Sequence, residues 1–409
     1  MSANLFFRLF LPFVFGNFLG SFYRSVNAVL APDIVAELSL SAEDIGLLTS
    51  VFFLVYAGIQ IPLGMALDRF GARRVSSFLY LIAGLSALVL AETSDYPTML
   101  VARAAMGLGI SVAFMGALKA VVDWVPREKL PITNSWIMMM GGAGVMAATL
   151  PLEYMLLLTD WRGIFFWLAI VTFVTVAALY FLPPEKPRPA EAAKVSAFKG
   201  VIQVFTNSDF LRMVPLGSSA QGVNMAMSSL WAGPWLRDVS GLSREGAAAV
   251  LFGMATTVTI SAFTIGPIAA FLARFGIPLT RTSSAGIAGF IIFEILIVAN
   301  VPVSPWLLWL PYAFFATAPT LVYSVFAESF PSHMTGRVNT AYNFTTFTFV
   351  FIVQWFIGAV IDLWPPVAEG QFAPEGYRWG LGIIVGVQIC AFIWMSVSSR
   401  AQAKAQATS

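Results

Sequence analysis

The stretch Gly64-Met-Ala-Leu-Asp68-Arg69-Phe-Gly71-Ala-Arg73-Arg74 places four charged side chains between two long apolar segments. These segments extend over about residues 45–67 and 75–92. A helix needs roughly 20 mainly apolar residues to cross the hydrocarbon core of a bilayer. The charged stretch is therefore predicted to be a turn that joins two membrane-spanning helices on one side of the membrane.

The composition of the whole chain agrees with a membrane protein. Charged residues make up 11% of the 409 residues and hydrophobic residues 58%, whereas a soluble globular chain has roughly 25% charged residues. A soluble protein, a disordered chain, a collagen and a coiled coil are therefore excluded. The single cysteine, Cys390, and the single histidine, His333, argue against a disulfide framework, a thiolate metal cluster and a His-rich zinc site.

Twelve apolar segments are long enough to be predicted as membrane-spanning helices. They cover about residues 6–30, 45–67, 75–92, 98–122, 133–158, 163–182, 212–236, 246–272, 282–300, 304–327, 338–362 and 379–397. With the N-terminus placed in the cytoplasm, the inner segments hold sixteen Lys and Arg residues and the outer segments four. This asymmetry predicts that both termini are cytoplasmic. The asymmetry favours a multi-pass protein of a cell membrane. A bacterial inner membrane fits the short loops, and a eukaryotic membrane stays open as the alternative.

The longest polar stretch lies near the middle of the chain. Residues 183–210 are rich in Pro, Ala and Lys and are predicted to form a cytoplasmic linker. The expected domains are an N-terminal six-helix bundle over residues 1–182, a C-terminal six-helix bundle over 211–400 and a cytoplasmic tail over 401–409.

Two turns of the first half recur in the second half. Asp68-Arg69-Phe70-Gly71 matches Ala273-Arg274-Phe275-Gly276, and Leu40-Ser41-Ala42-Glu43 matches Leu242-Ser243-Arg244-Glu245. Ser41 and Ser243 are each placed to cap the N-terminus of the following helix. The repeats predict two parallel six-helix halves related by a pseudo-two-fold axis, as in rocking secondary transporters.

Three motifs resemble the major facilitator superfamily. The stretch from Gly64 to Arg74 resembles its motif between helices two and three, Arg103-Ala-Ala-Met-Gly107-Leu-Gly109 resembles its helix-four motif, and Asp160-Trp161-Arg162 resembles its turn between helices five and six. The resemblance implies an all-α membrane fold of twelve helices and transport by alternating access, without enzymatic activity, cofactor or metal. It also implies that the substrate site lies between the two halves.

Departures from subfamily motifs narrow the function. Helix five reads Gly141-Gly142-Ala143-Gly144, which fits the motif of drug-exporting antiporters poorly. Helix one, from Phe22 to Pro32, is similar to that of organic-anion members, in which an arginine at the place of Arg24 reads the charge of the substrate. Asn224-Met225 stands where organophosphate members carry a second arginine, so a two-arginine phosphate clamp is not expected.

The expected substrate site is charged in the N-terminal half and neutral in the C-terminal half. An arginine inside a span is costly to insert and marks a functional site or an interior ion pair, and Arg24 is expected to hold a carboxylate because its planar fork stays charged. Lys119 would attract an anion or extend to the cytoplasmic surface. The other expected contacts are aromatic rings and amides: Tyr23, Asn27, Gln221, Asn224, Tyr323, Tyr342 and Asn343.

Proton coupling and gating are expected from other charged residues. Glu153 would exchange a proton and pair with Arg24 or Arg103 while ionised, or serve only as a structural partner, and Arg103 would act in coupling or in helix packing. Asp68 would latch the closed inner gate by accepting hydrogen bonds at a helix N-terminus. The other expected gating residues are Arg69, Arg73, Arg74, Glu328 and Arg337.

Three functions remain open. The favoured one is proton-coupled uptake of a small organic anion by a monomer that has no nucleic-acid partner. The alternatives are an exporter or exchanger of an amphipathic metabolite, drug or siderophore, and a transporter-like sensor that binds a ligand without moving it.

Overall fold

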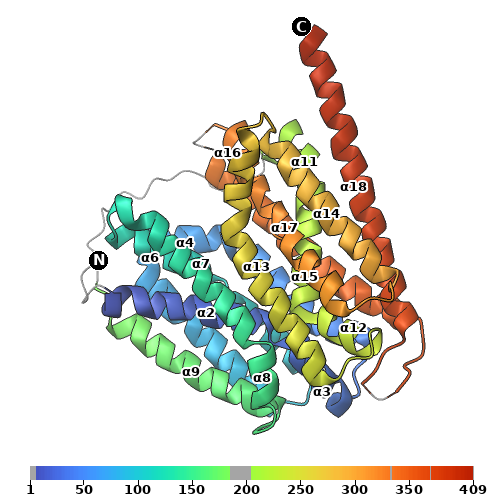
Figure 1. The fold of residues 1–409 in the computed structure, drawn as a ribbon. Coiled ribbons are helices and arrows are strands. Elements are labelled where there is room, and N and C mark those ends of the chain that lie inside the picture. Colours follow the sequence, from blue (N-terminus) through green and yellow to red (C-terminus); the bar gives the residue numbers. More distant parts are fainter. Residues whose placement is uncertain (1–5, 185–203, 332–333, 369, 409) are drawn as a thin grey trace. The chain divides into compact units, whose positions relative to one another are not determined.

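The structure, a computed structural model, describes residues 6–184, 204–331, 334–368 and 370–408, and the regular elements in these ranges are helices (Figure 1). Contacts divide the chain into two compact units, Met1–Val195 and Ser196–Ser409. Part of the predicted linker, with Lys186, Arg188, Lys194 and Lys199, lies outside the described residues, and so does His333. The predicted all-α class is confirmed for the part of the chain that is described.

The N-terminal unit is built from helices that differ widely in length. Its elements are η1 (Phe6–Phe10), α2 (Leu11–Ser25), α3 (Asn27–Leu38), α4 (Ala42–Glu92), α5 (Tyr96–Ile110), α6 (Val112–Trp124), η2 (Arg127–Lys129), α7 (Leu130–Ala147), α8 (Leu150–Met155) and α9 (Trp161–Phe181).

The C-terminal unit has the same all-helical character. Its elements are α11 (Ser208–Ala226), η3 (Met227–Trp231), α12 (Ala232–Asp238), α13 (Arg244–Ala273), α14 (Leu279–Val298), α15 (Pro305–Phe315), η4 (Ala318–Thr320), α16 (Leu321–Ser329), α17 (Thr335–Ile361) and α18 (Pro374–Thr408).

Nine helices among the described residues are long and apolar enough to cross a membrane. One of them, α4, has 51 residues and changes direction at Gly71, which has φ 82° and ψ 163°. A straight helix of that length would be about 77 Å long, far more than the roughly 30 Å of a bilayer core. The residues before and after Gly71 are therefore two arms of a hairpin, and they cover the predicted spans at 45–67 and 75–92.

The repeated turns have matching backbone geometry. Gly71 and Gly276 both have positive φ, 82° and 76°, a region that residues with a side chain rarely occupy. Ser41 accepts a hydrogen bond from Asp44 N and Ser243 accepts one from Gly246 N. Both predicted N-caps are confirmed, and the two halves share these local signals.

Three predicted boundaries differ from the structure: two predicted breaks are largely helical, and one predicted helix is divided. The segment Pro32–Leu38 was expected to be a polar break, but it belongs to α3, which follows α2 after a single residue, Val26. The predicted turn at Asp68–Arg74 is also helical on both sides of Gly71. The fifth predicted span divides instead, because α7 ends at Ala147 and α8 begins at Leu150. Charged residues are common in the terminal turns of membrane helices, so charge marks a helix end only approximately.

Close approach of helices holds each unit together. In the N-terminal unit, a Cβ on Gly144 of α7 would lie 2.2 Å from the carbonyl oxygen of Phe18 on α2. In the C-terminal unit, a Cβ on Gly217 of α11 would lie 2.8 Å from the hydroxyl of Tyr342 on α17. Small residues at such contacts let helix backbones approach in the absence of a hydrophobic driving force within lipid.

Candidate functional site

Arg24 lies in the last turn of α2 and its side chain is half-buried. Its Nη2 donates to Ser21 Oγ at 3.0 Å, one turn earlier on the same helix. Among the residues that the structure describes, no carboxylate pairs with this guanidinium. Arg24 therefore keeps its positive charge and most of its hydrogen-bonding capacity for another partner.

Arg103 on α5 is buried, with 2% of its surface exposed. Its Nη2 donates to Asn27 Oδ1, its Nη1 lies 3.6 Å from Met106 Sδ, and its guanidinium lies 5.0 Å from the ring centroid of Phe165. Its Nε has no hydrogen-bond partner among the described residues. A second positive charge in the N-terminal unit is thus surrounded by an amide, a ring and a sulfur atom.

The expected substrate contacts Tyr23 and Asn27 are both buried inside the N-terminal unit. The Tyr23 hydroxyl lies 2.9 Å from Thr172 Oγ1 on α9, and Asn27 Nδ2 donates to Thr49 Oγ1 on α4 at 2.7 Å. Together with the bond from Arg103, these contacts fix the α2–α3 junction against three neighbouring helices. They hold in place the turn that carries Arg24.

Glu153 lies on α8 and is half-buried. The expected ion pair of this residue with Arg24 or Arg103 is not formed, because both arginines make their contacts with neutral groups. The helix break at Thr149, with φ −116° and ψ −117°, gives the short α8 its own position after α7. Spacing along one predicted helix could not reveal this break.

Lys119 on α6 is part of an ion-pair cluster, a setting that the sequence did not predict. Its Nζ lies 3.1 Å from Asp68 Oδ1 and 3.4 Å from Asp123 Oδ1. Asp68 was expected to accept from a helix N-terminus, yet in this structure its described partner is Lys119. The ammonium is held between two carboxylates, which ties Lys119 to Asp68 and Asp123 rather than to Arg24.

The three arginines after Asp68 spread over different partners. The guanidinium of Arg69 lies 5.1 Å from the ring centroid of Phe70. Arg73 lies 5.3 Å from the Tyr180 ring of α9 and donates from Nη1 to Pro183 O at 3.2 Å. Arg74 is exposed and helps to line a mainly apolar cavity of about 470 Å³ between the two arms of α4.

In the C-terminal unit, aromatic and amide side chains gather where α16 meets α17. The rings of Tyr323 and Tyr342 are in edge contact with centroids 4.8 Å apart, and the Tyr323 hydroxyl donates to Asn343 Oδ1. Tyr342 is buried and its hydroxyl donates to Pro319 O at 3.3 Å. Tyr323 and Asn343 are half-buried, so they form the accessible part of this polar group.

The remaining predicted residues of this unit lie on α11 and near the turn before α17. Asn224 is 8% exposed and accepts from Ser228 Oγ at 3.4 Å, whereas Gln221 is half-buried and its Oε1 has no partner among the described residues. Glu328 is exposed near the end of α16, and Arg337 is half-buried in the first turn of α17.

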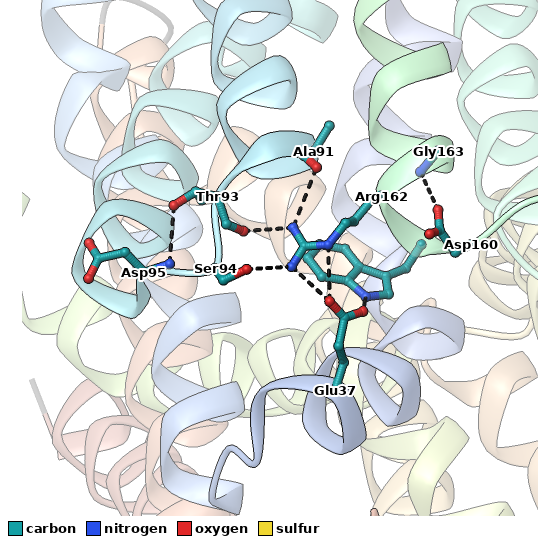
Figure 2. A network of polar contacts seen from close by, with 9 residues as sticks. Glu37, Ala91, Thr93, Ser94, Asp95, Asp160, Arg162 and Gly163 are labelled. Carbon is teal, nitrogen blue, oxygen red and sulfur yellow. Dashed lines mark hydrogen bonds and ion pairs between the residues drawn. The ribbon is translucent and has the colours of Figure 1, made fainter.

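The sequence did not predict the partners of Arg162, which ties three segments of the N-terminal unit together (Figure 2). Its Nη2 lies 2.8 Å from Glu37 Oε1 of α3, and its Nη1 donates to Thr93 O at 2.7 Å in the loop after α4. Trp161 Nε1 donates to the other oxygen of Glu37 at 2.6 Å. The motif at residues 160–162 indicated a turn, but its partners are far away in sequence.

In the part of the chain that the structure describes, no three His, Cys, Asp or Glu residues converge. Among the charged groups of the N-terminal unit, Arg24 donates to a serine, whereas Lys119 and Arg162 form ion pairs.

The model of the family described as "Major Facilitator Superfamily" matches residues 13–354. The chain belongs to this superfamily. Membership places this chain among multi-pass membrane transporters rather than enzymes. It also confirms the family that the three sequence motifs indicated.

Two curated proteins that are similar to part of this chain carry transporter names. The chain is 28% identical over 159 residues to the "Probable L-galactonate transporter" of Escherichia coli (strain K12), which is 39% of this chain and 35% of that protein. It is 33% identical over 99 residues to the "Probable sulfoacetate transporter SauU" of Cupriavidus necator, which is 24% of this chain and 23% of that protein. The matched segments span only about a third of these relatives or less.

A solved structure shares the fold over nearly the whole chain. The bacterial homolog of the human lysosomal transporter Spinster, in an inward-facing and unoccupied conformation, has a TM-score of 0.77 at 17% identity. The match covers 96% of each chain. At this identity the likeness establishes the fold alone.

Proposed function

We propose that the protein is a secondary active transporter that moves a small organic anion of the carboxylate type by alternating access, in proton-coupled uptake and as a monomer. The observation that carries the proposal is Arg24: a half-buried guanidinium in a membrane helix whose described partner is a neutral serine. An uncompensated charge in this environment costs about 3 kcal/mol. A bound anion would offset this cost, because a carboxylate accepts two parallel hydrogen bonds from the guanidinium fork.

The chemistry of the relatives points to the same class. Galactonate is a carboxylate and sulfoacetate carries a carboxylate and a sulfonate, and both names belong to proteins similar in part to this chain. In the C-terminal unit, Tyr323 and Asn343 offer neutral donors and acceptors that suit the uncharged part of a polar organic acid. The substrate class would then be an anion with a hydroxylated or otherwise weakly polar remainder.

Binding is tested by a thermal-shift screen of organic anions, including galactonate and sulfoacetate, on the purified protein. Arg24→Ala should remove the shift caused by a hit, and Arg24→Lys should keep only part of it because a lysine lacks the planar fork. The exposed Arg281 at the start of α14 gives a matched control, so Arg281→Ala should leave the shift intact. An unchanged shift in Arg24→Ala would refute the anchoring role.

Proton coupling is tested separately with Glu153. A hit from the screen is followed into proteoliposomes with an imposed pH gradient. Glu153→Gln should abolish accumulation driven by the gradient and retain counterflow of preloaded substrate, because counterflow does not need net proton movement. Gradient-driven accumulation that survives the substitution would exclude Glu153 as the coupling group. Export against the expected direction would favour an exporter, and binding without any flux would favour a sensor.

Twelve crossings with both termini in the cytoplasm complete the proposal. The two arms of α4 and the distribution of Lys and Arg support this topology. Single cysteines introduced into a Cys390→Ser background test it in intact cells. Asn300→Cys should react with an impermeant thiol reagent from outside and Glu128→Cys should not, and the reverse pattern would invert the topology.

A further inference from the structure

Glu294 is a wholly buried acid in the C-terminal unit, with 0% of its surface exposed. It lies on α14, about 8 Å along the axis from the middle of that helix at 1.5 Å per residue. Half of a bilayer core is about 15 Å thick, so this carboxyl group lies inside the hydrocarbon layer. Its side chain is packed inside the unit and has no exposed path to the surface.

Two more buried polar side chains face the same place from neighbouring helices. The amide of Gln388 on α18 lies near enough to hydrogen-bond with the carboxyl group of Glu294. The hydroxyl of Tyr312 on α15 is close enough to Glu294 to interact with its charge. Gln388 is 0% exposed and Tyr312 is 1% exposed. We call Glu294, Gln388 and Tyr312 the buried acid cluster.

The helix pairing around the cluster fixes this arrangement. Ser284 Oγ lies 4.0 Å from Met395 Sδ at one end of the α14–α18 contact, and Arg378 Nε donates to Val298 O at 3.3 Å at the other end. These two contacts bracket Glu294 and Gln388 on antiparallel helices. On the α15 side, the rings of Phe290 and Tyr312 are 4.6 Å apart between centroids. The three polar groups are therefore held by packing on both sides of α14.

Within the cluster, the amide of Gln388 lies near enough to donate to the Glu294 carboxyl group. Outside the cluster, none of its polar side-chain atoms has a hydrogen-bond partner among the described residues. These atoms are both carboxyl oxygens of Glu294, both amide atoms of Gln388 and the hydroxyl of Tyr312. A buried polar group without a partner costs about 1–3 kcal/mol, and an isolated buried carboxylate costs far more. Side chains with such a cost are expected to bind something or to satisfy one another.

No described cation neutralises Glu294. The neighbouring faces of α15 and α18 present Tyr312 and Gln388, both uncharged. Arg378 of α18 is bonded to the carbonyl of Val298, one helical turn away, and is exposed. The elements α11, α13, α16 and η4, which also pack against α14, bring no charged group to the carboxyl oxygens in the described part of the chain.

A proton makes the three groups chemically complementary. A carboxylate only accepts hydrogen bonds, so it can pair with the amide N–H of Gln388 but leaves the amide oxygen without a donor. A carboxylic acid has one donor and one acceptor, which match the amide oxygen and amide N–H of Gln388 in a paired arrangement. The Tyr312 hydroxyl can then donate to the remaining lone pair of the acid, so that one proton on Glu294 satisfies all three side chains.

We propose that the buried acid cluster is a proton-binding site of the C-terminal unit, in which Glu294 carries the proton at neutral pH. The proton bonds to one carboxyl oxygen of Glu294 and gives a neutral acid, with Gln388 and Tyr312 as its hydrogen-bonding partners. This site is separate from Glu153 of the N-terminal unit and does not depend on the identity of the substrate.

Infrared spectroscopy of the purified protein tests the proposal. A protonated carboxylic acid has a carbonyl stretch that is separate from those of ionised carboxylates and shifts when hydrogen is exchanged for deuterium. The wild type should show this band at neutral pH, and Glu294→Gln should lose it. Glu375→Gln, which changes an exposed glutamate at the start of α18, should retain it. A wild type without the band, or a band that survives in Glu294→Gln, would overturn the proposal.

A second variant keeps the test informative should Glu294→Gln fail to fold. Gln388→Leu leaves the acid in place and removes its partner, so the band should remain and its frequency should change. An unchanged frequency would contradict the acid–amide pairing. Sodium is the competing ligand, and it is tested by comparing the melting temperature in sodium chloride with that in an equal concentration of choline chloride. A higher melting temperature in sodium chloride that is seen in the wild type and lost in Glu294→Gln would show that the cluster binds sodium instead of a proton. An equal response of both proteins supports the proton.

Discussion

Replacing Gly107 by alanine should separate two helices of the N-terminal unit. Gly107 lies on α5, one turn after Arg103, and packs against the backbone of Phe52 on α4. A Cβ at this position would lie 2.2 Å from the Phe52 carbonyl oxygen and 2.9 Å from its carbonyl carbon. Ordinary contact begins at about 3.4 Å, so the backbones must move apart by about 1.2 Å.

The size of the effect follows from a comparison with a second glycine. Gly58 is a helical residue of the same unit, on α4, and a Cβ there would meet nothing within 4 Å. Alanine stabilises a helix interior by roughly 0.5–1 kcal/mol relative to glycine, and this gain is common to both substitutions. The difference between the variants is then the steric cost alone, which is about 1–3 kcal/mol for an overpacked contact. We expect the upper part of this range, because a backbone carbonyl cannot rotate away.

Thermal unfolding of the purified protein in detergent measures this difference. Gly58→Ala should unfold at or slightly above the melting temperature of the wild type, and Gly107→Ala should unfold clearly below it. The displaced α5 should also weaken the contact of Arg103 with Asn27. Equal melting temperatures for the two alanine variants would refute the close contact between α4 and α5.

Three further predictions concern charged groups. Arg162→Ala should lower the melting temperature by the equivalent of about 1–2 kcal/mol, because Glu37 and the carbonyl of Thr93 lose their partner; a loss no larger than that of an exposed arginine would contradict the tie. Asp68→Asn should slow transport more than it weakens substrate binding, since Asp68 pairs with Lys119; equal losses in both would place it at the substrate. Burial raises the pKa of Asp238 above its ordinary 3.8, so the stability of the wild type relative to Asp238→Asn should be greatest below that value and fall as pH rises through the raised pKa; a difference independent of pH would refute this.

Local signals predicted much of the fold. Long apolar segments, the charged turn before Gly71 and the serine caps at positions 41 and 243 depend only on neighbouring residues. The structure has helices over each of these segments, and both caps are formed. Exact helix ends were less predictable, because Pro32 and the charged residues after it remain helical in α3.

The sequence indicated the chemical character of the candidate functional residues better than it indicated which residues they contact. Arg24 was expected to be a charged group inside the membrane, and the structure places it half-buried in α2 beside neutral groups. Lys119 was expected to attract an anion or to extend to the cytoplasmic surface, and its partners Asp68 and Asp123 come from α4 and from its own helix. Partners on other helices depend on how the helices rotate about their axes, and a single sequence does not encode that rotation in a readable pattern.

The sequence by itself determined that this chain is a bundle of membrane helices with matching turns at two pairs of positions, because apolar length and turn chemistry are properties of consecutive residues. Only the tertiary structure decided that Arg162 ties α3 to the loop after α4 and that Glu294 is sealed between α15 and α18. Burial depends on which faces meet across distances of many residues. The same glutamate could extend to the surface on one helix face or lie fully buried on another, and only packing distinguishes these outcomes.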